Sequence, residues 1–98
     1  MTINTNTNGS TVTVALVGRL DTTTAPELEG TLKSVFDGCS KLVFDFSNLE
    51  YVSSAGLRVL LASQKTMNKQ GDMVIRNVDP SIMEVFEITG FVDILTIE

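Results

Sequence analysis

Several residue types on which enzymes and metal sites depend are missing from this sequence, or nearly so. It has no histidine, no tryptophan and a single cysteine, Cys39, among 98 residues. Zinc sites of the Cys/His kind and Ser-His-Asp triads are therefore excluded. The phosphate-binding motifs GxxxxGK[ST] and GxGxxG are absent, and Asp-x-Asp metal spacing never occurs. We therefore expect neither an enzyme nor a bound metal or cofactor.

Positive charge and long apolar runs are also scarce. Seven Lys and Arg are scattered along the chain against twelve Asp and Glu, which gives a net charge of −5. Nucleic-acid binding needs clustered Lys and Arg, so we expect no nucleic-acid partner. No apolar run approaches the roughly 18 residues of a membrane span, and the opening MTINTNTNGS does not resemble a signal peptide. We expect a cytoplasmic protein without membrane contact, and the lone cysteine fits a reducing compartment.

What the sequence does contain is a regular alternation of strand and helix patterns. Apolar residues alternate along 12–20, which is typical of a strand with one buried face. Asn8-Gly9 just before it predicts a tight hairpin to a short first strand. Further apolar runs rich in strand-forming residues predict strands at 41–46, 73–78 and 92–97.

Helices are predicted between these strands, at residues 24–36, 54–70 and 80–89, and a glycine follows each of them. Thr24 and Glu27 have the spacing of a capping box at the first helix start. The resulting order ββαβαβαβ predicts one α/β domain over residues 1–98. Its sheet should be mixed but mostly parallel, with an opening antiparallel hairpin and helices packed on the sheet.

The second predicted helix carries small or apolar residues on two sides. At 100° per residue, one cluster forms the expected core face: Leu57, Leu60, Leu61 and Met67. The opposite side carries Ala55, Val59, Ala62 and Thr66, with a margin of Arg58, Lys65 and Lys69. A flat apolar strip with a basic margin indicates a docking surface for a partner. The alternative is an ordinary outer face on which scattered apolar residues are tolerated.

Two serines, Ser53 and Ser54, precede the small residues Ala55 and Gly56 where this helix begins. Either serine could cap the helix, which contributes about 1 kcal/mol. A phosphoryl group at the same place would meet free N–H groups and the positive end of the helix dipole. It would also bring about −1.5 to −2 charge to the rim of the apolar strip. The residues alone leave the plain cap and the phosphorylation switch as equal alternatives.

Three motifs resemble the STAS domains of bacterial anti-sigma-factor antagonists, over essentially the full chain. GRLDTTTAPEL at 18–28 is similar to the family's GxLDxxTAxxL. FDFSNLEYVSSAGLRVLL at 44–61 is similar to its apolar strand followed by DS(S/T/A)GL, and NVDPSIMEVFEITGFVDIL at 77–95 is similar to its closing helix and strand.

The resemblance implies a phosphorylated serine at Ser54, with Ser53 as the alternative. It implies that the unphosphorylated domain binds an anti-sigma factor that is itself a serine kinase, so that a sigma factor is released. Phosphorylation would eject the domain, and a serine phosphatase would reset it. Asp21 matches the family's aspartate in the loop beside the serine. We expect the partner-binding surface to consist of Asp21, Thr22, Thr23, Ser53, Ala55, Gly56, Arg58, Val59 and Ala62. We expect the protein to be a monomer or a weak dimer.

Three residues depart from the family pattern. Ser53 replaces the aspartate before the serine, Ala55 replaces a second Ser or Thr, and Arg19 takes a place that is often acidic. One alternative is therefore an adaptor subunit of a signalling or transport complex that is never phosphorylated. Another is a nucleotide-binding STAS domain, although no phosphate-cradling loop supports it.

Overall fold

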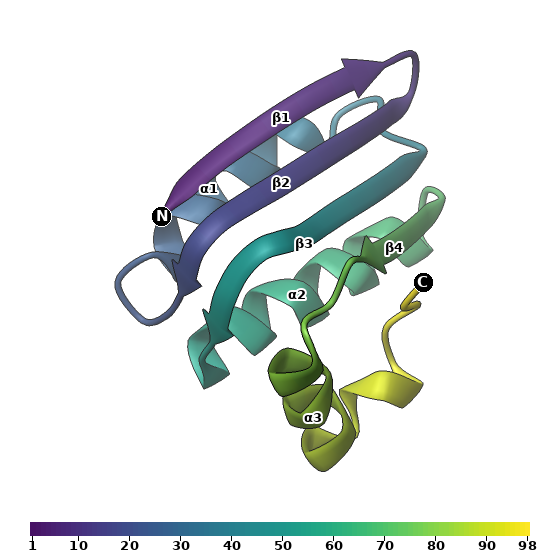
Figure 1. Cartoon of the computed structure of the whole chain (residues 1–98). Helices are drawn as coiled ribbons and strands as arrows, with labels where there is room; N and C mark the ends of the chain where they lie inside the picture. Colours follow the sequence, from purple (N-terminus) through teal and green to yellow (C-terminus); the bar gives the residue numbers. More distant parts are fainter.

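Four strands form one mixed sheet in the order β1-β2-β3-β4 (Figure 1). The structure is a computed structural model that describes residues 1–98. β1 is antiparallel to β2, whereas β2 pairs with β3 and β3 pairs with β4 in parallel. The strands are β1 (Thr2–Asn8), β2 (Thr11–Leu20), β3 (Lys41–Val52) and β4 (Asp72–Arg76). The predicted α/β class, the opening hairpin and the mostly parallel sheet are confirmed.

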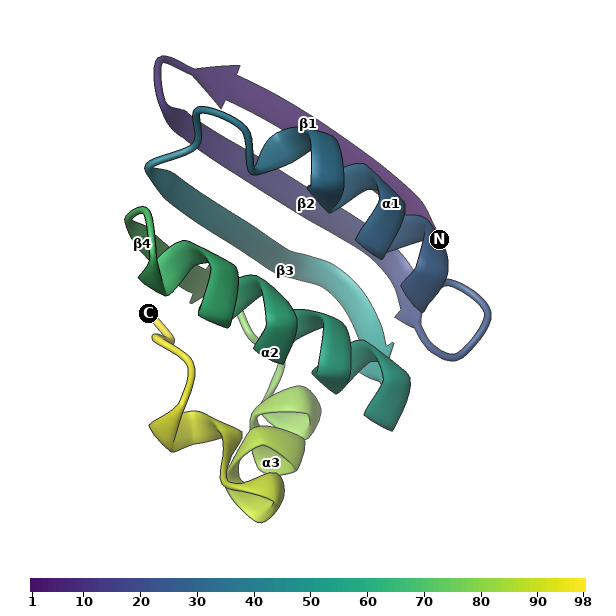
Figure 2. The same ribbon diagram turned by 180° about the vertical axis from the view of Figure 1, so that it is seen from behind.

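The helices are α1 (Ala25–Val35), α2 (Ser54–Asn68) and α3 (Pro80–Thr89), followed by a short 3-10 helix, η1 (Phe91–Asp93). α1 and α2 cover the same face of the sheet: both lie behind it in Figure 1 and in front of it in Figure 2. The core lies in this layer, and its largest fully buried side chains include Phe44, Phe46, Leu28, Leu32, Leu60 and Met67. The core residues predicted on the alternating strand are buried too: Val12, Val14, Leu16 and Leu20.

β3 is twice as long as the predicted strand 41–46. The prediction was too short because buried and exposed residues do not alternate in the second half of β3. The pairing with β2 shifts between Ala15 and Val17 and again between Gly18 and Arg19. At each shift β3 contributes one residue more than β2, as in a β-bulge. The buried residues of this part are therefore three apart, namely Phe46, Leu49 and Val52. The alternation of apolar and polar residues therefore ends at the first of them.

The strand predicted at 92–97 is wrong over most of its length. Gly90 has φ 80° and turns the chain out of α3, and η1 follows at once. The amide of Leu95 then donates to the carbonyl of Phe91, 2.8 Å away. Only Ile97 pairs with the sheet, in a single parallel bridge to Ile75 of β4. Local turn hydrogen bonds thus replace the expected ladder.

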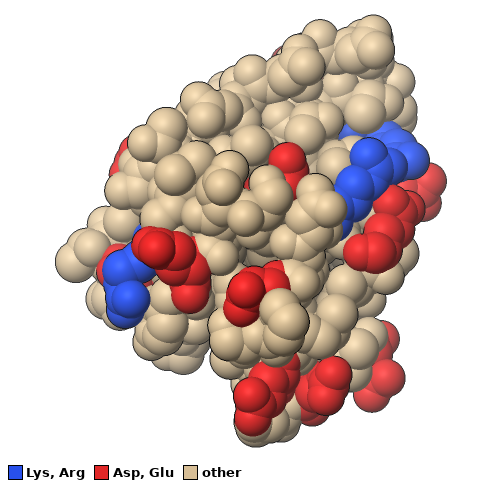
Figure 3. Space-filling model, viewed as in Figure 1, with Lys and Arg blue, Asp and Glu red and all other residues tan.

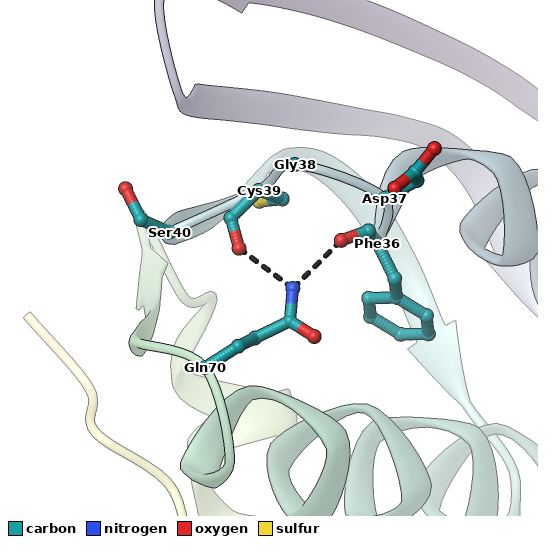
Figure 4. A pocket seen from close by; sticks show the side chains of 6 residues that line it. All are labelled: Phe36, Asp37, Gly38, Cys39, Ser40 and Gln70. Atoms are coloured by element: carbon teal, nitrogen blue, oxygen red, sulfur yellow. Dashed lines mark hydrogen bonds between the residues drawn. The ribbon is translucent and has the colours of Figure 1, made fainter.

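At the other end of the sheet, the chain before β3 is fastened to the end of α2. The side-chain amide of Gln70 donates to the carbonyls of Phe36 and Cys39, at 2.7 and 2.6 Å, across a shallow hollow (Figure 4). Cys39 is buried, and desolvation raises the pKa of its thiol, as expected for a structural side chain. α2 ends at Asn68, and Gly71 serves close packing, because a Cβ there would overlap the carbonyl of Ser40.

Charged side chains lie mainly at the margins of the face seen in Figure 1. Figure 3 shows Lys and Arg at two edges of this face, acidic side chains around α3, and a largely uncharged surface between them. None of the helices is both long enough and apolar enough to cross a membrane.

Candidate functional site

The candidate site lies at the carboxyl ends of the parallel strands β2 and β3, the usual place for sites in α/β sheets. Leu20 pairs with Val52 at the last step of this ladder, and the amide of Ser53 donates to the carbonyl of Leu20 at 2.8 Å. Because of this bond, the loop that begins at Asp21 and the start of α2 leave the sheet side by side. Asp21 and the two serines, far apart in the sequence, therefore share one end of the sheet.

The two serines have different roles at the start of α2. Ser53 is the N-cap, and its hydroxyl accepts a hydrogen bond from the amide of Gly56 at 3.3 Å. Ser54 is the first helical residue; its side chain is exposed and makes no hydrogen bond. Ser53 therefore caps the helix, and the hydroxyl of Ser54 makes no hydrogen bond within the protein.

Gly56 fixes the distance between α2 and the sheet. A Cβ built on it would lie 2.7 Å from Cγ of Leu20 and 3.1 Å from the carbonyl oxygen of the same residue. Real Cβ atoms do not approach other atoms this closely, so only glycine allows the first turn of α2 to rest on the end of β2. Gly56 is buried and has an internal packing role, and the predicted partner contact at Gly56 stays a prediction.

Asp21 organises the loop between β2 and α1. One of its carboxylate oxygens accepts hydrogen bonds from the amide and hydroxyl of Thr23, at 3.0 and 2.7 Å, and from the amide of Thr24 at 3.1 Å. The bond from the Thr23 hydroxyl is the largest cause that lowers the pKa of Asp21, while desolvation acts in the opposite direction. Asp21 is thus ionised at neutral pH, and its hydrogen bonds hold the loop in one shape.

The predicted capping box between Thr24 and Glu27 does not form. Thr24 is the N-cap of α1, but its side chain bonds to no helix amide. Its hydroxyl accepts from the amide of Asp21 and donates to the carbonyl of Arg19, both at 2.8 Å. The hydroxyl of Thr24 therefore forms its hydrogen bonds with the turn before the helix, and not with the helix amide that the capping-box pattern predicts.

Arg19 and Tyr51 add a feature that the sequence analysis did not identify. They are paired across β2 and β3, and Cζ of Arg19 lies 4.3 Å from the centre of the Tyr51 ring. The Nε atom of Arg19 is also 3.9 Å from a carboxylate oxygen of Asp21. Tyr51 is 41% exposed, so this stack presents an aromatic and cationic surface next to Asp21. Arg19 and Tyr51 could be paired in advance only if the register of β2 and β3 beyond the two bulges were known, and a single sequence does not give this register.

The predicted apolar strip of α2 faces α1 and is not open to solvent along its whole length. Val59 is only 6% exposed, so the prediction that it lies on an outer face is wrong. It forms the floor of a groove whose first hollow is lined by Thr22, Ala25, Pro26, Glu29, Ala55, Arg58, Val59 and Ala62. A second hollow continues along both helices and shares Glu29, Val59 and Ala62 with the first.

The structure therefore brings together most of the residues predicted for partner binding. One hollow is lined by Thr22, Ala55, Arg58, Val59 and Ala62. Asp21 and Thr23 flank Thr22 in the chain, and Ser53 caps the helix that carries the other four. Pro26 and Glu29, which form the wall contributed by α1, were not predicted, because the pattern of one helix does not show which helix packs against it. No cluster of His, Cys, Asp and Glu that could hold a metal is found.

The candidate site is thus a groove between two helices of a small α/β domain, with a serine at the start of one of them. The STAS domain family matches residues 2–98, and the chain belongs to that family.

Among curated proteins, the chain is 39% identical over 84 residues to the anti-sigma factor antagonist BtrV of Bordetella bronchiseptica, covering 84% of this chain and 72% of that protein. It is 32% identical over 97 residues to the anti-sigma-B factor antagonist of Staphylococcus aureus, covering 97% and 90%. Both relatives are named as antagonists.

Two solved structures show the same fold. An anti-sigma factor antagonist from Mycobacterium paratuberculosis superposes with a TM-score of 0.89 at 26% identity, covering 98% of this chain and 83% of that one. The phosphorylated form of the Bacillus cell fate determinant SpoIIAA superposes with a TM-score of 0.78 at 17% identity, covering 99% and 91%.

Proposed function

We propose that this STAS domain is an anti-sigma-factor antagonist whose binding is switched off by phosphorylation of Ser54. The observation that carries the proposal is the division of labour between the serines. Ser53 is engaged as the N-cap, and Ser54 offers an exposed hydroxyl one residue later. The curated relatives named as antagonists, and a phosphorylated protein among those that share the fold, support it.

In this proposal the unphosphorylated domain binds an anti-sigma factor that is a serine kinase and so frees a sigma factor. The contact surface combines the groove between α1 and α2 with the loop of Asp21, Thr22 and Thr23. Buried apolar area around Ala55 and Ala62 supplies affinity, and the charged rim supplies orientation. A serine phosphatase resets the switch. The domain itself performs no catalysis and acts in the cytoplasm.

Phosphorylation would oppose binding for electrostatic reasons. A phosphoserine carries about −1.5 to −2 charge at neutral pH, and a partner pressed against α2 would have to desolvate it. Taking such a charge out of water costs on the order of several kcal/mol, which is enough to separate bound from free states. Because the start of α2 has no acidic residue in its first turn, the phosphate would be the only negative charge there.

The test uses the purified protein and the anti-sigma-factor kinase of the same organism. Ser54→Glu should weaken the complex at least tenfold in isothermal titration calorimetry, whereas Ser54→Ala should bind like the unmodified protein. Ser34→Glu is the matched control, because it adds the same charge at an exposed position of α1 that lines neither hollow. Equal affinity of the Ser54→Glu and Ser34→Glu variants would contradict the switch.

The adaptor hypothesis uses the same surface without phosphorylation, and Ser53 in place of the family aspartate is the observation that favours it. Mass spectrometry distinguishes the two hypotheses. Trypsin releases residues 42–58 as one peptide that contains both serines. Under the switch, protein isolated from its own cells carries phosphate on Ser54 in a fraction that changes with growth conditions. A bare peptide under every condition supports the adaptor.

A further inference from the structure

Arg58 is the one arginine of this chain without an ionic or aromatic partner. Arg19 stacks on Tyr51, and Arg76 forms an ion pair with Glu98 at 2.7 Å. Arg58 is exposed on α2 and forms neither a salt bridge nor a side-chain hydrogen bond. This unpaired guanidinium lies one helical turn from Ser54, so it is available to bind a phosphate on that serine.

We propose that Arg58 is the intramolecular binding residue for the phosphate on Ser54, an inference that rests on the proposed function. The two residues are four apart in α2, so their side chains lie on the same side of the helix, about 5–6 Å apart at Cβ. Both are exposed, whereas Gly56 and Leu57 between them are buried. The negative group precedes the positive one, which is the favourable order for such pairs.

The surroundings leave Arg58 available for this pairing. Glu29 lines the same hollow from α1, but it forms no ion pair with Arg58. The carboxylate of the β2–α1 loop, Asp21, accepts hydrogen bonds from Thr23 and Thr24 and lies close to Arg19. A guanidinium donates two parallel hydrogen bonds to a phosphate, which a lysine cannot reproduce. An arginine at position 58 therefore suits phosphate binding better than a lysine would.

The pairing would change how the switch works. The phosphate would be held along the first turn of α2, over the rim of the groove formed with α1. Part of its charge would be compensated inside the domain, which stabilises the phosphorylated protein. A phosphatase would have to displace Arg58 before it reaches the phosphorus, so Arg58 would also slow the reset.

The experiment uses phosphoserine placed at position 54 during synthesis of the full chain, with no kinase or partner present. The second ionisation of the phosphate is followed by ³¹P NMR, in the unaltered chain and in the R58Q, R58K and K65Q variants. K65Q is the matched control because Lys65 is an exposed cation on the same helix, about three turns away. R58Q should raise the second pKa of the phosphate by about half a unit, because an opposite charge is removed.

R58K should lie between the unaltered chain and R58Q, and K65Q should match the unaltered chain. Melting temperatures give a second measurement: R58Q should lower that of the phosphorylated chain by about 2–4 °C and leave that of the unphosphorylated chain within about 1 °C. Equal phosphate pKa values in R58Q and K65Q would overturn the proposal. Because the phosphate is installed chemically, a failure here is distinct from a failure to find phosphate on Ser54 in cells.

Discussion

Gly56 shows how one small residue positions the whole candidate site. Alanine is the better helix former by about 1 kcal/mol, so helix propensity alone predicts that Gly56→Ala stabilises the protein. The clash of its Cβ with Leu20, at 2.7 Å, should outweigh this gain. We expect Gly56→Ala to lower the free energy of unfolding by about 1–3 kcal/mol, measured by urea denaturation.

Gly30 is the matched control for this substitution. It lies inside α1, and a Cβ built there would meet nothing within 4 Å. Gly30→Ala should therefore raise the free energy of unfolding, by up to about 1 kcal/mol. If the two substitutions changed stability in the same direction, close packing at the start of α2 would not be the reason for Gly56.

The loop before α1 shows where residue-level rules were incomplete. Thr24 and Glu27 satisfied the capping-box pattern, yet the hydroxyl of Thr24 bonds to Asp21 and Arg19. The pattern records which groups are able to bond along the sequence. The capping-box pattern does not show that the end of β2 places the carbonyl of Arg19 within hydrogen-bond distance of the Thr24 hydroxyl.

The pair α1 and α2 forms a surface that neither helix has alone. Ala62 is exposed and lines both hollows of the groove between them. If the anti-sigma factor covers this groove, Ala62→Glu should weaken the complex at least tenfold. The stability of the free domain should change by no more than about 0.5 kcal/mol, as is usual for exposed helix positions.

Binding by calorimetry and urea denaturation of the same sample test this expectation. Ala62→Ser serves as the control, because it keeps the residue small and uncharged and should retain binding. Full affinity of the Ala62→Glu variant would place the partner elsewhere, for example on the stack of Arg19 and Tyr51.

The pairing of β2 with β3 is another property of elements taken together. The bulges let Leu49 and Val52 stay buried despite a spacing of three, and β3 continues as far as Val52, the residue before Ser53. The site depends on this extension, because a strand that ended at Phe46 would leave the serines away from Asp21.

The stability of the whole molecule should depend on pH in a way set by its carboxylates. Hydrogen bonds lower the pKa values of Asp21, Asp45 and Asp79, most strongly those from the side chains of Thr23, Asn77 and Ser81 respectively. A lowered pKa in the folded state means that folding favours the charged form. The resulting stabilisation is complete above the unfolded value of about 3.9 and is lost as the pH falls through the folded values.

We therefore expect a nearly constant melting temperature from about pH 7 to 5 and a decline below about pH 4. Differential scanning calorimetry across this range measures it. Asp45→Asn keeps an acceptor for Asn77 and the amide of Ser47 but cannot ionise, so its decline should be shallower. A melting temperature that rises below pH 4 would show that these hydrogen bonds do not control acid stability.

The sequence by itself determined the class of fold, the alternating face of β2, the helix positions and the serine pair at the start of α2. These features are local, since side-chain period and helix signals act over a few neighbouring residues. The tertiary structure decided which serine caps the helix, that Val59 forms the floor of a groove, and that the predicted last strand shrinks to one bridge at Ile97. The groove depends on contacts between α1 and α2, which are far apart in the chain. The cap and the closing turn are local hydrogen bonds, but which local bond forms depends on where β3 and α3 end in the fold, and a linear pattern does not contain this.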